Sequence, residues 1–149
     1  MRTTILIGFL LGLASTPLSA QNSLKLSRAV FVERLSDDNL SKVVEPANQL
    51  QRGETVLLVV EWQNPPTGGS FEVSSQIPAE LQYRGSSDDS QIVSIDGGRS
   101  WGRIGTLRIS DAYGQRFATV EDVTHLRWQV SSRNAAYGRG QITYSAIVR

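Results

Sequence analysis

His125 is the chain's only histidine, the residue type that serves most often in general acid–base catalysis. Asp122 precedes it closely, and a serine such as Ser94 would complete a nucleophilic triad. The sequence around Ser94 lacks the Gly-x-Ser-x-Gly turn that exposes the nucleophile of α/β-hydrolases. We therefore interpret His125 as a surface or half-buried strand residue, and we predict no catalytic residues and no enzymatic activity.

Aspartates could bind calcium in an exported protein. Asp88, Asp89 and Asp96 form one group in the sequence, and Asp37 and Asp38 form another. Neither group has the alternating spacing of a calcium-binding loop. Solvated loop tips explain both groups better, so we predict no metal site.

Glu61 and Glu72 could supply paired acids for glycoside hydrolysis if their strands were adjacent. Exposed strand positions also explain both residues, and the sequence indicates no cleft between them. One histidine and no cysteine leave only carboxylates to hold a transition metal. We therefore predict no cofactor.

Aromatic side chains could bind sugars by stacking. Trp62, Trp101 and Trp128 would form a platform with Tyr83 or Tyr113 if two of the tryptophans faced solvent together. Trp62 and Trp128 share the parity of the aliphatic residues of their strands, which favours the core. Sugar binding through exposed aromatic residues is the alternative function that the sequence leaves open.

A polar turn precedes the second tryptophan, with fixed positions at Ser94, Asp96, Gly98, Ser100 and Trp101. An aspartate that opens a turn can accept backbone N–H groups, and a following glycine supplies the positive φ that a bulged hairpin needs. We predict that Asp96 bonds to the turn backbone, that Gly98 takes a positive φ and that Trp101 is buried. This set is interpreted as a structural turn between two strands.

The spacing of these residues resembles the Asp-box, a hairpin motif of sialidase-like propellers and of some secreted proteins that are not propellers. A propeller needs several blades of about forty residues each. The chain has 149 residues, one copy of the motif and no internal repeat. The sequence therefore excludes a propeller.

The first twenty residues resemble a secretory signal peptide. Arg2 gives a short positive region, residues 5–13 are apolar, and residues 17–20 form a cleavage site. The apolar run is too short for a stable membrane span. We expect residues 21–149 to form one exported domain, periplasmic or extracellular, with no stable membrane insertion after cleavage.

The composition restricts the partners. Discounting Arg2, the 15 basic residues become 14 and balance the 14 acidic ones, so no basic surface favours nucleic acid. Because the chain has no cysteine, the domain must be held by its core alone. We predict a protein partner or self-association, with a glycan as the alternative and no nucleic acid.

Apolar residues of 21–149 alternate with a period of two, and no helical period appears. This pattern predicts an all-β fold, an antiparallel immunoglobulin-like β-sandwich of about eight strands. Residues 133–139 are expected to be a loop. Strand-like stretches are 23–34, 42–45, 55–63, 70–74, 81–83, 92–95, 100–109, 123–131 and 140–148.

Residues 53–64 resemble the opening of the conserved immunoglobulin-like domain of unknown function number eleven, a repeat of bacterial and archaeal surface proteins. Further matches are residues 71–73, the step 77–81, Tyr83 and the closing strand 140–148. The likeness spans about residues 53–149 and implies an immunoglobulin-like sandwich, with no catalytic residues to transfer. Members usually occur as repeats in very large adhesin-like chains, whereas we expect this chain to be a lone domain with an added N-terminal segment.

We therefore expect a non-enzymatic exported protein with a structural or protein-interaction role at the cell envelope. The added segment, residues 23–34, allows two arrangements. It could add to the sheet edge of a neighbouring copy, which would give self-assembly by strand addition. It could also complete its own sandwich, because sequential strands usually pair within their domain.

Overall fold

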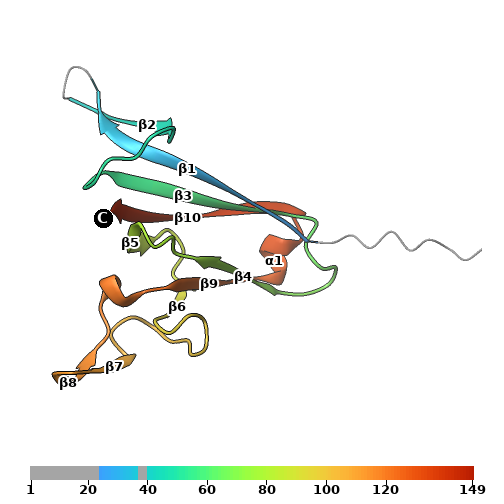
Figure 1. The fold of residues 1–149 in the computed structure, drawn as a ribbon. Helices are drawn as coiled ribbons and strands as arrows, with labels where there is room; N and C mark the ends of the chain where they lie inside the picture. The colour runs from blue at the N-terminus through green and yellow to red at the C-terminus, as the bar shows by residue number, and fades with distance from the viewer. Residues whose placement is uncertain (1–23, 37–39) are drawn as a thin grey trace, which may run out of the picture.

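A computed structural model describes residues 24–36 and 40–149, which form a sandwich-like all-β fold (Figure 1). The expected signal peptide, residues 1–20, lies outside the described residues, as do Asp37 and Asp38. No helix within the described residues is long and apolar enough to cross a membrane.

One layer is a five-stranded antiparallel sheet. In order across the sheet, its strands are β2 (Lys42–Pro46), β1 (Lys25–Leu35), β3 (Thr55–Gln63), β10 (Arg139–Val148) and β5 (Leu81–Ser86). The segment 23–34 could have paired with a neighbouring copy, but β1 pairs with β3 of its own chain from Lys25 to Glu33.

The other layer is a three-stranded antiparallel sheet, and a separate two-stranded hairpin projects beyond it. The three strands are, in order, β4 (Phe71–Gln76), β9 (His125–Val130) and β6 (Ile92–Ser94). The hairpin consists of β7 (Arg108–Asp111) and β8 (Gly114–Phe117).

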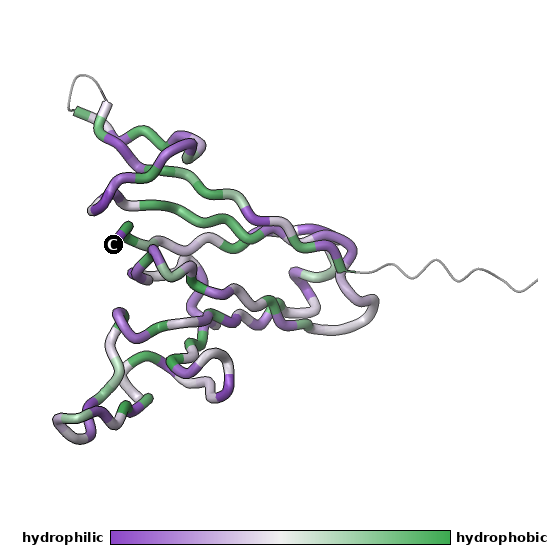
Figure 2. The backbone as a smooth tube through the Cα atoms, in the orientation of Figure 1, coloured by the Kyte–Doolittle hydropathy of each residue, from purple (hydrophilic) through white to green (hydrophobic). Residues whose placement is uncertain are grey.

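The hydrophobic core lies between the two sheets. Strand β3 shows the alternation that builds it, because Val56, Leu58 and Val60 are buried while Glu61 and Gln63 are exposed. Long hydrophobic stretches follow β1 and β3 in Figure 2. Strands β4, β5, β6, β9 and β10 contribute the facing and flanking side chains, among them Val73, Tyr83, Val93, Trp128 and Tyr144.

Strands β1 and β2 extend the larger sheet past this core. The core cluster contains no residue of β2, and β1 contributes the half-buried Val30 at its margin. Val32 of β1 is fully buried but lies outside this cluster. Every residue of β2 is exposed. Figure 1 accordingly shows this hairpin at the far side of the sheet from the three-stranded layer.

The expected strand 100–109 is wrong for most of its length. Residues 100–107 form no regular strand, apart from an isolated bridge between Gly102 and Val93. Thr106 instead donates two hydrogen bonds to the Arg103 carbonyl, one from its hydroxyl at 2.8 Å and one from its N–H at 3.1 Å. These bonds close a local turn. Regular pairing begins only at β7.

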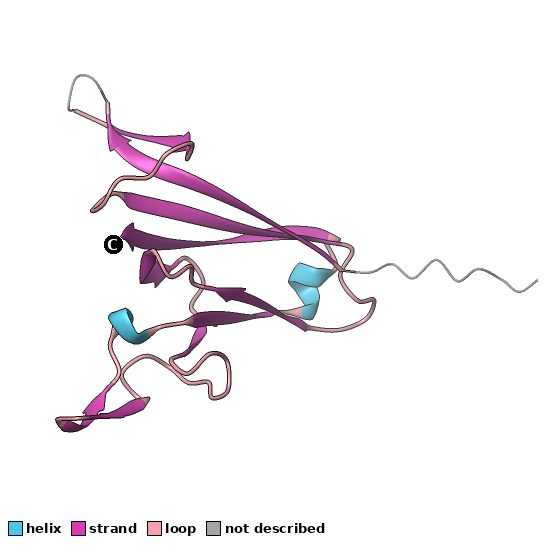
Figure 3. Cartoon of the chain, viewed as in Figure 1, coloured by secondary structure: helices cyan, strands magenta, loops and turns pink. Residues whose placement is uncertain are grey.

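Two short helical turns also depart from the all-strand expectation (Figure 3). One is the 3₁₀ turn η1 (Val120–Asp122), and the other is α1 (Ser132–Ala135), where a loop was expected. The Ser131 hydroxyl accepts the Asn134 N–H and caps α1. A single helical turn is too short to show a period in the sequence.

Candidate functional site

Asp96 organises the polar turn beside β6. Its Oδ1 accepts the N–H groups of Arg99 at 3.0 Å and Ser100 at 2.9 Å, and also the Ser94 hydroxyl at 2.8 Å. Its Oδ2 accepts the Ser100 hydroxyl at 2.5 Å. These donors, the Ser100 hydroxyl foremost, hold the pKa of Asp96 well below its ordinary value. The structure therefore contains the predicted bonds from Asp96 to the turn backbone.

Two glycines share the left-handed conformation of this turn. Gly98 has the predicted positive φ of 89°, and Gly97 also has a positive φ of 78°. The Ser94 hydroxyl accepts the Gly98 N–H at 2.8 Å. Thr124, which the sequence did not indicate, donates its hydroxyl to the Ser94 carbonyl and accepts the Gly97 N–H. The turn is thus fastened to the residue that precedes β9.

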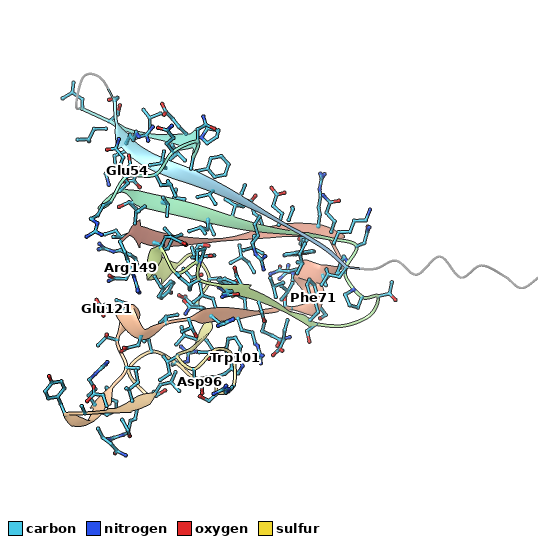
Figure 4. All side chains as sticks on the ribbon, in the orientation of Figure 1. Glu54, Phe71, Asp96, Trp101, Glu121 and Arg149 are labelled. Carbon is cyan, nitrogen blue, oxygen red and sulfur yellow. The ribbon has the colours of Figure 1, made fainter. Side chains whose placement is uncertain are left out.

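Trp101 is half-buried, so the prediction of a buried Trp101 is wrong. Its indole N–H donates to the Gly98 carbonyl at 3.0 Å, and the Arg127 guanidinium lies 3.9 Å from the ring centroid. His125 meets the ring edge-on. Arg127 and His125 alternate along β9 with the buried Leu126, so they lie on the outer face of the small sheet. That face is where Trp101 packs (Figure 4).

The strand register places Ser94 opposite His125, but it builds no triad. Ser94 is fully buried and its hydroxyl is used by the turn, while Nδ1 of His125 bonds to the Thr124 hydroxyl at 3.1 Å. Asp122 forms a bidentate pair with Arg116 at 2.7 and 2.8 Å. That guanidinium is the main reason that the pKa of Asp122 lies well below its ordinary value.

Glu61 and Glu72 are not on adjacent strands. Glu61 lies on β3 of the larger sheet and accepts the Ser27 hydroxyl, whereas Glu72 lies on β4 of the smaller sheet and pairs with Arg127. Both are exposed on the faces turned away from the core. The chain crosses from one sheet to the other between them, which separates the two carboxylates.

The described residues contain no cluster of three potential metal-ligating side chains among histidine, cysteine, aspartate and glutamate. Asp88 accepts the Ser90 N–H at 2.8 Å, and both oxygens of Asp96 are engaged within the turn. These carboxylates act on the backbone of their own loops.

The tryptophans do not form a stacking platform. Trp62 is 3% exposed and Trp128 is 0% exposed, as their strand parity predicts. The indole N–H of Trp128 donates to the Ser86 hydroxyl at 2.9 Å. Tyr83 is also buried, and Tyr113 stands fully exposed at the turn between β7 and β8.

The β1–β2 region collects exposed hydrophobic side chains. Among the described residues, ten large hydrophobic side chains are exposed, and six of them fall in this region. Two of these six, Val43 and Val44, are neighbouring residues of the same strand, β2. The six are Leu26, Leu35, Leu40, Val43, Val44 and Leu50.

The backbone phase of β2 follows from two hydrogen bonds at its ends. Ala47 N–H donates to the Val30 carbonyl at 3.0 Å, and Ser36 N–H donates to the Ser41 carbonyl at 2.9 Å. Bonded and non-bonded pairs alternate along an antiparallel ladder. Ser41 and Ala47 are both bonded positions, so the odd-numbered residues between them, Val43 and Glu45, also bond to β1. The backbone N–H and C=O groups of Lys42 and Val44 therefore point away from β1.

Ion pairs join the two strands of the β1–β2 hairpin to each other and to Glu54. Arg34 pairs with Glu45 at 3.5 Å and with Glu54 at 3.1 Å, while Lys42 pairs with Glu33. Glu54 also accepts the Gln51 N–H at 2.7 Å, which is the main reason that its pKa is lowered. Glu54 is labelled beside the hairpin in Figure 4. The sequence predicted a strand at 42–45, but the direction of its backbone groups required the register.

Comparisons with protein-family models, with curated proteins and with solved structures find no match. The likeness to surface-protein repeats stays a prediction. The functional proposal therefore depends on the residues of the β2 edge.

Proposed function

We propose that this chain is an exported, non-enzymatic interaction domain of the cell envelope that binds a protein partner through the free edge of β2. The observation that carries the proposal is the row of outward backbone groups at Lys42 and Val44, flanked by exposed valine side chains. An extended segment added to such an edge gains main-chain hydrogen bonds, and the exposed side chains select it.

The free edges of β6 and β4 are less suited to this role. Val93 of β6 exchanges backbone hydrogen bonds with Gly102 at 2.8 and 3.0 Å, so a segment of the same chain covers that edge. The exposed side chains of β4 are Glu72, Ser74 and Gln76, all polar. Polar and charged side chains on an edge disfavour pairing. Strand β2 also carries Lys42, Glu45 and Pro46, but unlike β4 it places two exposed valines, Val43 and Val44, at its centre.

A photo-crosslinking residue placed at Val44 in cells that export the protein would test this function. We expect covalent adducts at Val44 and none at Gln115, an exposed strand residue of the β7–β8 hairpin. The adducts should disappear in a chain that also carries Lys42→Pro, because proline removes one outward N–H donor. Equal yields at Val44 and Gln115, or no adduct at Val44, would refute docking at this edge.

A further inference from the structure

We infer that the partner at this edge is a second copy of the same chain, an inference that rests on the proposed function. The two copies pair antiparallel through β2 about a two-fold axis. Lys42 of one copy then faces Val44 of the other. The hydrogen-bonding phase of β2 and the position of Pro46 select this pairing.

The two-fold axis limits the possible registers. When the axis is perpendicular to the sheet, the same face of the sheet points the same way in both copies. An even-numbered residue of β2 must therefore face an even-numbered residue of the other copy, and an odd-numbered residue an odd-numbered one. With outward groups at Lys42 and Val44, three short registers are possible. The register that puts Lys42 opposite its own copy is disfavoured, because it sets like charges against each other. Two registers remain. One puts Val44 opposite its own copy and Lys42 opposite Pro46, which has no N–H to donate. The other pairs Lys42 with Val44 twice, and each pair exchanges both backbone hydrogen bonds.

The side chains agree with the second register. Val43 faces its own copy across the axis as a non-bonded pair, where Cα atoms approach to about 4.5 Å and side chains are closest. Glu45 faces Ser41, and Lys42 faces Val44. No two like charges stand directly opposite, an arrangement that would be destabilising. The edge is therefore complementary to itself in hydrogen bonds and apolar contact.

The expected dimer is weak. A pairing of five-residue strands falls below the roughly 1,000 Å² that stable interfaces exceed. Its formation should therefore depend on protein concentration, and dense surface packing or export to a confined compartment would favour it. In such a dimer the larger sheet of each copy continues into that of the other.

Single cysteines test the register directly, because the chain has no cysteine of its own. Residues 21–149 carrying Val43→Cys should form a disulfide dimer under mild oxidation. Val44→Cys is the matched control, because its Cα lies diagonal to its own copy at about 7–8 Å. That separation is at or beyond the limit for a disulfide. We expect dimer formation with Val43→Cys to be on the order of tenfold faster.

Sedimentation of the cysteine-free protein gives the second measurement. We expect a concentration-dependent dimer that Val44→Pro abolishes and Val44→Thr, which keeps the N–H, preserves. Near-ultraviolet circular dichroism shows whether each variant is folded. Faster crosslinking at Val44 than at Val43 overturns the register, and a monomer up to about millimolar concentration overturns self-pairing.

The photo-crosslinking adducts separate this inference from the proposed function. A mass of two copies supports self-pairing. Adducts at Val44 to a different protein contradict self-pairing while leaving the docking edge in place. Absence of any adduct contradicts both.

Discussion

At the scale of single residues, Asp96 turns a short loop into a fixed structure. Four donors within one turn stabilise the ionised carboxylate, which is why its pKa is lowered. A lowered folded-state pKa contributes stability that is present above the unfolded pKa of about 3.9 and lost as pH falls through the folded value. The turn should therefore weaken in acid.

We predict that Asp96→Asn lowers the unfolding midpoint at pH 7 and reduces the further loss between pH 4 and pH 2. Urea unfolding at several pH values measures this. Some acid dependence should remain, because Asp122 and Glu54 also have lowered pKa values. The exposed loop variant Asp89→Asn is the control. The same acid dependence in Asp96→Asn as in the unchanged protein would show that Asp96 does not supply it.

The sequence predicted this turn because the turn residues form hydrogen bonds with near neighbours in the chain. The exposure of Trp101 could not be obtained in the same way, since it depends on Arg127, which is brought over the ring by the pairing of β9 with β6. Thr124 was missed for the same reason, because its bonds to Ser94 and Gly97 join segments far apart in sequence.

At the scale of strands, β3 and β10 approach closely where Gly140 faces Trp62. A Cβ atom at Gly140 would lie 2.2 Å from Cζ2 of the Trp62 ring. The ring is buried and packs edge-on against Phe71 with centroids 5.2 Å apart, so it has little room to move. Glycine is required here by the space that the ring occupies.

We predict that Gly140→Ala destabilises the protein by about 1–3 kcal/mol or more, as overpacking of a core does. Gly85→Ala on β5 is the matched control, because a Cβ atom there meets nothing within 4 Å. Guanidinium unfolding measures both. Trp62→Phe should recover part of the loss when combined with Gly140→Ala, and additive effects in that double variant would contradict the proposed contact.

Strands that line the core were predictable, and strands away from it were not. Alternation in β3, β4, β9 and β10 reflects one buried face, which the sequence records directly. Strand β8 is exposed throughout, so no alternation marks it. The expected strand 100–109 failed because local turn bonds compete with pairing there.

At the scale of the whole molecule, the chain divides into a core-forming part and an N-terminal hairpin. All residues of the core cluster lie between Val56 and Val148, and among the described residues before them, only Leu24 and Val30 pack against it. The segment that resembles the surface-protein repeats, 53–149, is thus the part that builds the core. The sequence predicted the added strand at residues 23–34. It could not predict whether this strand pairs within the chain or with a second copy, because that depends on which sheet edge is free.

We predict that residues 52–149 alone retain a cooperative fold but lose stability and aggregate more readily. The loss should be at least about 2 kcal/mol, because Val32 is fully buried in the complete chain and its burial is removed. Without β1, strand β3 becomes an edge whose outer face carries Leu57 and Val59, and long apolar edges promote aggregation. Guanidinium unfolding and light scattering against residues 21–149 measure the two effects.

A lysine on that new edge distinguishes edge pairing from a damaged core. Val59 alternates with the buried Leu58 and Val60, so Val59→Lys changes the outer face alone. In the shortened chain it should reduce light scattering and leave the near-ultraviolet signal of the buried Trp128 unchanged. If residues 52–149 show no such signal even with the lysine, the β1–β2 hairpin is needed to form the core. Self-pairing through β2 would then engage a strand on which the fold itself depends.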